Sequence, residues 1–391
     1  MKSPPEVSQP ETTQSVKARY ERFPYPPLAP WSIPRAGEGE ELSYELGQRL
    51  CFGKSRTHEH IRILVVGCGS FEALVVAQQH PFAEEVVAVD LSEKSLLRLK
   101  WRMHLQKLVR PFKKIARIRL IRADFRELDD GGFDYILASN VLHHLPNPAA
   151  SLALLSAQLK AEGVLRVVTY PKTSRIFMRE TAAFFAAQGL HGNDHDLLNK
   201  CRQALHTLPH SHRLRTCFSS QSEIFKPAGL VDAFFHPLEN ALSPWQWKEA
   251  SLASGLTLGG ESQVETSRSE FLDFILPELA LTDPWVKLQI LDDLLELCSN
   301  PIWWFFKSKK EVPASPPVKF NLDFNEVVDF EAEIAQARTR VESLLSPTLV
   351  TFSELRQRLR EKIGPRIHFK TGETLPGLSL SEVLEHAEKI D

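Results

Sequence analysis

Between residues 61 and 171, apolar segments rich in β-branched residues alternate with helix-forming segments, and this alternation restricts the possible folds. Helices are expected at about 71–79, 92–109 and 148–159. Strand and helix alternating at this spacing are typical of a parallel sheet covered by helices on both faces. We therefore predict a doubly wound α/β fold. Its strands are IRILVVG (61–67), EVVAVDL (85–91), RIRLIRAD (117–124), FDYILAS (133–139) and GVLRVVTYP (163–171).

Two later segments complete a mostly parallel, seven-stranded sheet in this prediction. They are DAFFHPL (232–238) and LTLGGESQV (256–264). Between them, Ser243 is the expected N-cap of a helix whose first residue is Pro244, a position that tolerates the missing N–H of proline.

The rest of the chain divides by composition. Residues 1–42 are proline-rich in their first part and are expected to form an extended N-terminal arm. Residues 43–265 form the expected main domain, and about 172–220 are a polar, helical insertion. Residues 266–391 are expected to be a C-terminal helical extension, in which the aromatic run at 301–310 packs into a core.

The overall composition is that of a globular protein. The chain has 391 residues, of which 43% are hydrophobic and 25% charged, and its net charge of −2 gives no general attraction to polyanions. Five scattered cysteines without a Cys-x-x-Cys pair favour reduced thiols and a cytoplasmic location. No run of 18 apolar residues predicts a membrane span, and the first residues lack the apolar core of a signal peptide.

Small residues follow the first strand, where ligands of open parallel sheets bind. Gly67-Cys68-Gly69 allows a ligand close to the backbone, and Asp90 ends the second strand 21 residues beyond Gly69. An acidic side chain there can accept hydrogen bonds from ribose hydroxyls. This spacing suits a dinucleotide or S-adenosylmethionine, because both contain adenosine.

The loops after the third and fourth strands narrow this choice. Asp124 could accept from an adenine amino group beside Phe125, and Asn140 follows the fourth strand. The set resembles the class I S-adenosylmethionine-dependent methyltransferases over about residues 55–170. The resemblance implies a Rossmann-like methyltransferase with S-adenosylmethionine as cofactor. By resemblance, the cofactor pocket is lined by Gly67, Cys68, Gly69, Asp90, Leu91, Asp124, Phe125 and Asn140.

The chain departs from the family pattern at two positions. Val65 stands where an acidic residue is frequent, and Phe71 replaces a third glycine. Glu72 opens the following helix and would repel a pyrophosphate, which disfavours an NAD-dependent oxidoreductase. The altered loop and the lack of a base motif leave a catalytically silent S-adenosylmethionine-binding scaffold as the alternative.

The arm contains RYERFPYPP (19–27), which resembles a bacterial subgroup of these methyltransferases. This resemblance implies that Arg19, Tyr20 and Tyr25 fold over the cofactor or the substrate. Packing of these side chains on the domain surface is the alternative interpretation.

Histidines supply the candidates for proton transfer and metal binding. His143 and His144 follow the fourth strand, where a neutral imidazole could take a proton from a methyl acceptor. No catalytic residue is assigned, because such histidines also occur in this fold without a catalytic role. The His-rich stretches HGNDHD and HSH lack a third ligand at a recognised spacing, so no metal is expected.

Residues 98–122 hold ten Lys or Arg and no Asp or Glu. They predict either a solvated amphipathic helix or a docking surface for RNA or an acidic protein. The sequence leaves open whether the methyl acceptor is a protein, RNA or a small molecule.

Overall fold

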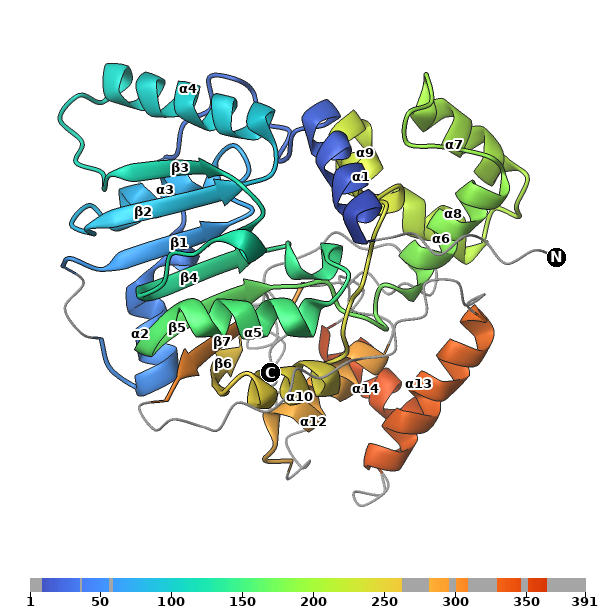
Figure 1. The fold of residues 1–391 in the computed structure, drawn as a ribbon. Coiled ribbons are helices and arrows are strands. Elements are labelled where there is room, and N and C mark those ends of the chain that lie inside the picture. The colour runs from blue at the N-terminus through green and yellow to red at the C-terminus, as the bar shows by residue number, and fades with distance from the viewer. Residues whose placement is uncertain are drawn as a thin grey trace.

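The computed structural model describes residues 9–35, 37–55, 59–261, 281–294, 300–308, 329–345 and 351–363. Within these residues a seven-stranded sheet has the order β3-β2-β1-β4-β5-β7-β6 (Figure 1). Its strands are β1 (Arg62–Val66), β2 (Glu85–Asp90), β3 (Ile118–Arg122), β4 (Phe133–Ser139), β5 (Leu159–Val168), β6 (Leu256–Glu261) and β7 (Ile302–Lys307). The predicted doubly wound, mostly parallel, seven-stranded α/β sheet is confirmed.

The strand directions bring the candidate site together. Strand β1 pairs in parallel with β2 and β4, and β3 and β5 extend this parallel part outward. Strand β7 is antiparallel to both of its neighbours, and Val168 of β5 lies opposite Ile302. The carboxyl ends of β1 to β5 therefore share one edge of the sheet.

Helices cover both faces of the sheet because its strands are buried on both sides. Ile63 and Val65 pack with α2 (Tyr44–Phe52), α3 (Glu72–Gln79) and α4 (Glu93–Val109). Leu64 and Val66 join the opposite core, which includes residues of α5 (Pro148–Gln158), α10 (Pro244–Ala253) and α12 (Pro284–Asp293). Successive residues of a strand point to opposite faces, so β1 serves both cores.

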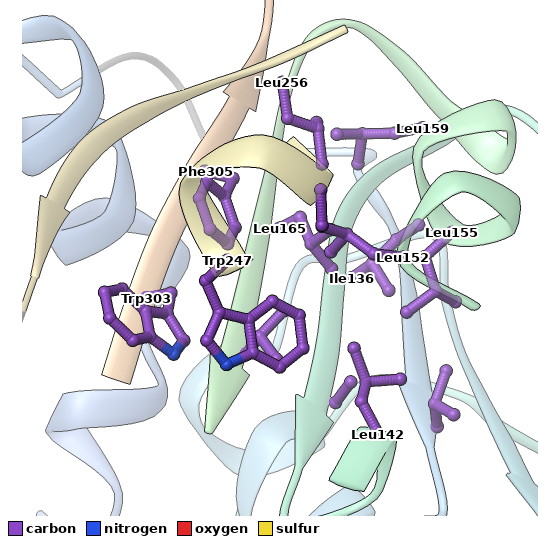
Figure 2. Packing of buried hydrophobic residues seen from close by; sticks show 14 of the residues in the cluster. Ile136, Leu142, Leu152, Leu155, Leu159, Leu165, Trp247, Leu256, Trp303 and Phe305 are labelled. Atoms are coloured by element: carbon purple, nitrogen blue, oxygen red, sulfur yellow. The ribbon is translucent and has the colours of Figure 1, made fainter. Parts of the chain in front are cut away.

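Aromatic residues fill the core beside β7. Trp303 stacks on Trp285 with ring centroids 5.3 Å apart and lies near Trp247, as Figure 2 shows for Trp247 and Trp303. Trp303 and Trp304 are both buried. The expected core packing of the aromatic run is therefore confirmed for its described residues.

Further helices stand beyond the carboxyl ends of the strands (Figure 1). Their apolar residues form a separate cluster that includes Phe185, Cys201, Phe218 and Phe234. Helices α6 to α8 occupy the segment expected to be a helical insertion. The remaining helices are α1 (Gln9–Arg22), α6 (Ile176–Ala187), α7 (Leu197–His206), α8 (Arg213–Ser219), α9 (Pro227–Phe234), α13 (Phe330–Leu345) and α14 (Phe352–Ile363).

Two expectations were wrong. DAFFHPL (232–238) is not a strand: its start ends α9, in which Leu230, Val231 and Phe234 are buried at helical spacing. The arm is not extended over residues 9–22, because α1 forms there and buries Val16 and Arg19, three residues apart on one helical face.

Residues 266–391, expected to be a C-terminal helical extension, contain helices α12, α13 and α14 and also a strand. Strand β7 lies in this part and occupies the sheet position between β5 and β6. The sheet therefore uses residues on both sides of the boundary at 265. Ser243 does cap α10, in a capping box with Gln246 and with Pro244 in the first turn, as predicted.

Candidate cofactor-binding site

A cavity of about 890 Å³ opens at the carboxyl ends of the parallel strands. It is lined by the loops that follow β1, β2, β3 and β4, and by the arm. Arg19 and His143 do not line it. Of the predicted residues, the cavity is lined by Gly67, Cys68, Gly69, Asp90, Leu91, Asp124, Phe125, Asn140, Tyr20, Tyr25 and His144.

The loop after β1 requires glycine at two positions. Gly67 and Gly69 have φ of +59° and +55°, in the left-handed region that favours glycine. A Cβ atom on Gly67 would lie 2.5 Å from Cγ2 of Val141, and one on Gly69 would lie 2.9 Å from the carbonyl oxygen of Tyr25. The arm thus rests against the loop at the distance that only glycine allows.

Asp90 is fixed at the end of β2 by backbone donors. Its Oδ2 accepts from the amide of Gly69 and its Oδ1 from the amide of Ser92, both at 2.8 Å. Burial raises the pKa of Asp90, while these two hydrogen bonds oppose the rise. Each carboxylate oxygen has a second acceptor site, so Asp90 can still accept hydrogen bonds from a ligand.

Asp124 lines the cavity with a partner that the sequence analysis missed. Its Oδ1 accepts from Nε of Arg126 at 2.9 Å, and its Oδ2 from Nη2 at 2.6 Å. Burial would raise the pKa of Asp124, but the hydrogen bonds and charge of Arg126 prevail and lower it. The i, i+2 spacing is the only sequence signal for this pair, and it is too common to be specific.

Asn140 takes a backbone conformation that asparagine tolerates better than most residues. Its φ is +55°, and its amide donates to the carbonyl of Val168 at 2.9 Å. Its Oδ1 accepts from Nδ2 of Asn300 at 3.3 Å. Asn300, which precedes β7, also lines the cavity and was not predicted.

A buried polar chain lies at the start of α3. Ser139 donates from Oγ to Oε1 of Glu72 and accepts from Nη1 of Arg166, both at 2.9 Å. Burial raises the pKa of Glu72, and the charge of Arg166 opposes the rise. Glu72 and Arg166 both line the cavity. A carboxyl group therefore sits where a dinucleotide would place a phosphate.

The two candidate histidines differ in position. The Nδ1 atom of His143 accepts from the amide of Tyr170 at 3.1 Å, and burial and then the charge of His144 hold the pKa of His143 well below its usual range. His144 lines the cavity, with Nδ1 2.9 Å from the carbonyl oxygen of Leu238. That contact places the proton on Nδ1 of His144, and burial lowers its pKa. Both imidazoles are held neutral.

The arm packs aromatic and charged side chains against the segment 222–234. Arg19 forms an ion pair with Asp232, and its guanidinium lies 4.5 Å from the ring centroid of Tyr20. The hydroxyl of Tyr25 donates to Oε2 of Glu223 at 3.0 Å. Asp232 and Glu223 come from α9 and from the turn η4 (Ser222–Phe225), and both line the cavity. Asp232 was not predicted as a lining residue, because the sequence analysis assigned residues 232–238 to a strand of the sheet.

Arg102 does not belong to a surface patch. Its side chain is buried and donates to the carbonyl oxygens of Ser70 at 2.9 Å and Ala29 at 3.0 Å. Other members of the basic segment, such as Arg119, form ion pairs. Large apolar side chains are exposed along the same segment, among them Trp101, Leu108 and Phe112.

The described residues carry no sign of two other kinds of site. No helix within them is both long and apolar enough to cross a membrane. Nor does the described part of the chain bring together three or more His, Cys, Asp or Glu side chains that could hold a metal ion.

Residues 64–165 match the family model described as a methyltransferase domain. An uncharacterized protein of Synechococcus sp., syc1184_c, is 30% identical over 258 residues, which are 64% of this chain and 60% of that relative. The uncharacterized phycocyanin operon protein W of Pseudanabaena tenuis is 31% identical over 91 residues, 23% of this chain and 85% of that protein.

Among solved structures, PKMT2 from Rickettsia typhi has a TM-score of 0.52 and 16% identity, covering 93% of this chain and 74% of that one. A second structure of PKMT2 is in complex with AdoHcy, with a TM-score of 0.51.

The sheet order and the matched model together support the class I S-adenosylmethionine-dependent methyltransferase family. The chain belongs to the same family as phycocyanin operon protein W, over the 91 residues that the two share.

Proposed function

We propose that this protein is a methyltransferase that uses S-adenosylmethionine. The observation that carries the proposal is a single cavity that gathers the predicted loop residues after four neighbouring strands. The matched methyltransferase-domain model covers the segment from β1 to β5 that supplies those loops. The cofactor supplies a methyl group already activated by its sulfonium charge, and positioning then provides most of the catalysis.

The residues present fit this cofactor. Gly67 and Gly69 allow the loop to turn at positive φ beside the cavity, and Asp90 keeps acceptor sites for ribose hydroxyls. A cavity of about 890 Å³ is near the upper end of the usual range for ligand sites, so a second ligand has room beside the cofactor. Glu72, the first residue of the helix after the glycine loop, lines the cavity and favours a cofactor that carries positive charge and no phosphate.

The roles of the chain's own residues follow from this placement. Gly67, Cys68 and Gly69 would contact the cofactor through their backbone, Asp90 would bind its ribose, and Asp124, Phe125 and Leu91 would surround its adenine. Asn140 would lie near the reacting end. The arm, with Tyr20 and Tyr25, covers the loop and excludes water from the cavity.

Isothermal titration calorimetry with S-adenosylmethionine, S-adenosylhomocysteine and NAD tests this function. We expect binding of the first two and no response to NAD. Transfer of a labelled methyl group into cell-lysate fractions then separates an enzyme from a silent scaffold. Binding of NAD with no response to either sulfur compound would contradict the proposal.

Three finer expectations belong to the same proposal. The subgroup with a Tyr-Pro-Tyr-Pro-like arm is supported by the contact between Tyr25 and Gly69. A cytoplasmic location is supported by the scattered cysteines. An acidic protein at the exposed part of 98–122 is favoured over RNA, because Trp101, Leu108 and Phe112 are exposed among the lysines.

A further inference from the structure

Part of the cavity lining comes from the arm, from η4 and α9, and from the loop after β5. Tyr20 and Tyr25 come from the arm, Glu223 and Asp232 from η4 and α9, and Tyr170 from the loop after β5. The hydroxyl of Tyr170 donates to Oδ2 of Asp232 at 3.3 Å. Phenols and carboxylates therefore surround the space in which a methyl acceptor would meet the cofactor.

The charge of the lining is strongly one-sided. Two arginines oppose seven carboxylates, which are Glu38, Glu41, Glu72, Asp90, Asp124, Glu223 and Asp232. Of the two arginines, Arg175 is compensated by a bidentate ion pair with Glu239 at 3.0 Å. Just outside the lining, Arg19 compensates Asp232 and Arg126 compensates Asp124. Glu223 accepts from the neutral phenol of Tyr25, so this contact leaves its negative charge in place.

We propose that the methyl acceptor is an amine that enters as an ammonium ion, drawn in by Glu223 at the cavity mouth. The proposal rests on methyl transfer as the function of this cavity. An excess of carboxylates attracts cations and raises the cost of bringing in a phenolate, a thiolate or a phosphate. An amine is the nucleophile that arrives as a cation and reacts as a neutral group.

The chemistry balances without a protein base. The ammonium ion gives one proton to water and exposes the nitrogen lone pair. A bond forms between this nitrogen and the methyl carbon while the bond between carbon and sulfur breaks, and its electron pair stays on sulfur. The positive charge passes from sulfur to nitrogen, so the charge within the cavity is unchanged.

A hydroxyl acceptor would require the protein to supply a general base. It must lose its proton before or during the transfer, which calls for a general base close to the reacting atom. His143 and His236 do not line the cavity. His144 does, and with its Nδ1 proton on the carbonyl of Leu238 its Nε2 is the basic nitrogen, but burial lowers the pKa of this imidazole and makes it a weak base.

The test uses the full chain and begins with binding. Calorimetry is run on protein saturated with S-adenosylhomocysteine, with spermidine as a free amine and poly-L-lysine as a polypeptide amine, at about 150 mM salt, where exposed charges are largely screened. Catechol serves as a hydroxyl probe. We expect one or both amines to bind. Binding of spermidine would identify a small-molecule acceptor, and binding of poly-L-lysine a polypeptide acceptor.

Glu223→Gln keeps the shape of the side chain and removes its charge. We expect the Kd of the amine to rise about two- to fivefold, which is the range for losing one exposed charge contact. The affinity for S-adenosylhomocysteine should stay unchanged. Glu249→Gln is the matched control, because Glu249 is exposed on α10 and does not line the cavity.

Methyl transfer from labelled S-adenosylmethionine to the same probes completes the test. Labelled amine supports the inference. If the protein binds S-adenosylhomocysteine but neither amine, or if it methylates catechol and neither amine, the inference is overturned and the proposed function stands. Failure to bind either S-adenosylmethionine or S-adenosylhomocysteine would instead overturn the proposed function.

Discussion

Arg102 donates a hydrogen bond of 2.9 Å to the carbonyl oxygen of Ser70, directly after the glycine loop. The same guanidinium donates to Ala29 at 3.0 Å and, through Nε, to Ser32 at 3.1 Å. One buried side chain of α4 therefore connects the cofactor loop with the arm that covers it. This geometry makes the arm part of the candidate site.

Replacing Arg102 with Gln should release the arm. Several buried carbonyl oxygens would lose a charged donor, and we expect the free energy of unfolding to fall by about 1.5 to 3 kcal/mol. Urea denaturation measures this loss, and limited trypsin digestion should cut faster at Arg35. Lys107→Gln, at an exposed position of the same helix, is the control. Equal digestion of the two variants would show that Arg102 does not hold the arm.

Gly69→Ala should weaken cofactor binding and destabilise the protein by more than about 1 kcal/mol, the usual limit for glycine replaced at positive φ. The new methyl group would meet the carbonyl oxygen of Tyr25 at 2.9 Å. Gly53→Ala separates backbone strain at positive φ from the clash with the arm. Gly53 has φ of +70° but nothing within 4 Å of a Cβ atom. We expect Gly53→Ala to lower only the thermal midpoint, and equal cofactor affinity in both variants would rule out the arm contact.

Asp90→Ala should reduce affinity for S-adenosylhomocysteine by about 1.5 to 3 kcal/mol, because a charged acceptor of two hydroxyls is lost. Calorimetry measures the change, and circular dichroism checks that the variant folds. Asp129→Ala, in the loop before β4, does not line the cavity and serves as the control. Unchanged affinity in folded Asp90→Ala would remove this residue from the site.

Acid should destabilise the protein through its buried histidines. Burial holds the pKa of His143 and His236 well below their usual value near 6.5. Below about pH 6.5 the unfolded chain therefore binds protons that the folded chain does not. The free energy of unfolding should fall from about pH 7 to 5, by at most about 1.4 kcal/mol per pH unit for each histidine.

Denaturation of His143→Gln across the same pH range checks this interpretation. The slope of stability against pH should become shallower, whatever the absolute stability of the variant. His104→Gln replaces an exposed histidine of α4 and should leave the slope unchanged. A slope that is identical in all three proteins would contradict the assignment to buried histidines.

Reversing the charge of Lys100, Lys107 and Lys114 tests the basic segment without disturbing Arg102. We expect the unmodified protein to bind poly-L-glutamate more tightly than polyuridylate, and the reversed variant to lose this binding. RNA would be favoured instead if polyuridylate binds and the slope of the logarithm of its binding constant against the logarithm of salt concentration is smaller in the reversed variant, by about 0.7 to 0.9 for each lysine. Cofactor affinity should not change.

The sequence predicted the first five strands because they are apolar segments rich in β-branched residues, and all but the half-buried β3 and the arginine-interrupted β5 contain a continuous apolar run. Such strands are buried on both faces, so their pattern depends little on distant contacts. The loop residues Gly67, Asp90 and Asn140 could be predicted for the same reason, since each follows a recognisable strand. Their common cavity follows from the parallel direction of the strands.

Elements that depend on distant partners could not be predicted in this way. Strand β7 reads as an aromatic run, and only its pairing with β5 and β6 makes it a strand. The segment around Arg102 has the basic composition of a solvent-exposed helix face, which predicts an exposed arginine. Arg102 is instead held by partners in the arm, about 70 residues earlier. The ion pair of Arg19 with Asp232 joins α1 to α9 across 213 residues, and no local pattern specifies it.

The position of β7 has a consequence for synthesis on the ribosome. Val164 to Val168 of β5 pair with Ile302 to Phe306, so the nascent chain must present β5 as an open edge until β7 has emerged. Open strand edges recruit other chains, and long-range pairing of this kind is slow. The period between translation of β5 and of β7 is therefore when this protein most needs chaperone protection, and C-terminal truncations before residue 307 should aggregate rather than yield a smaller working enzyme.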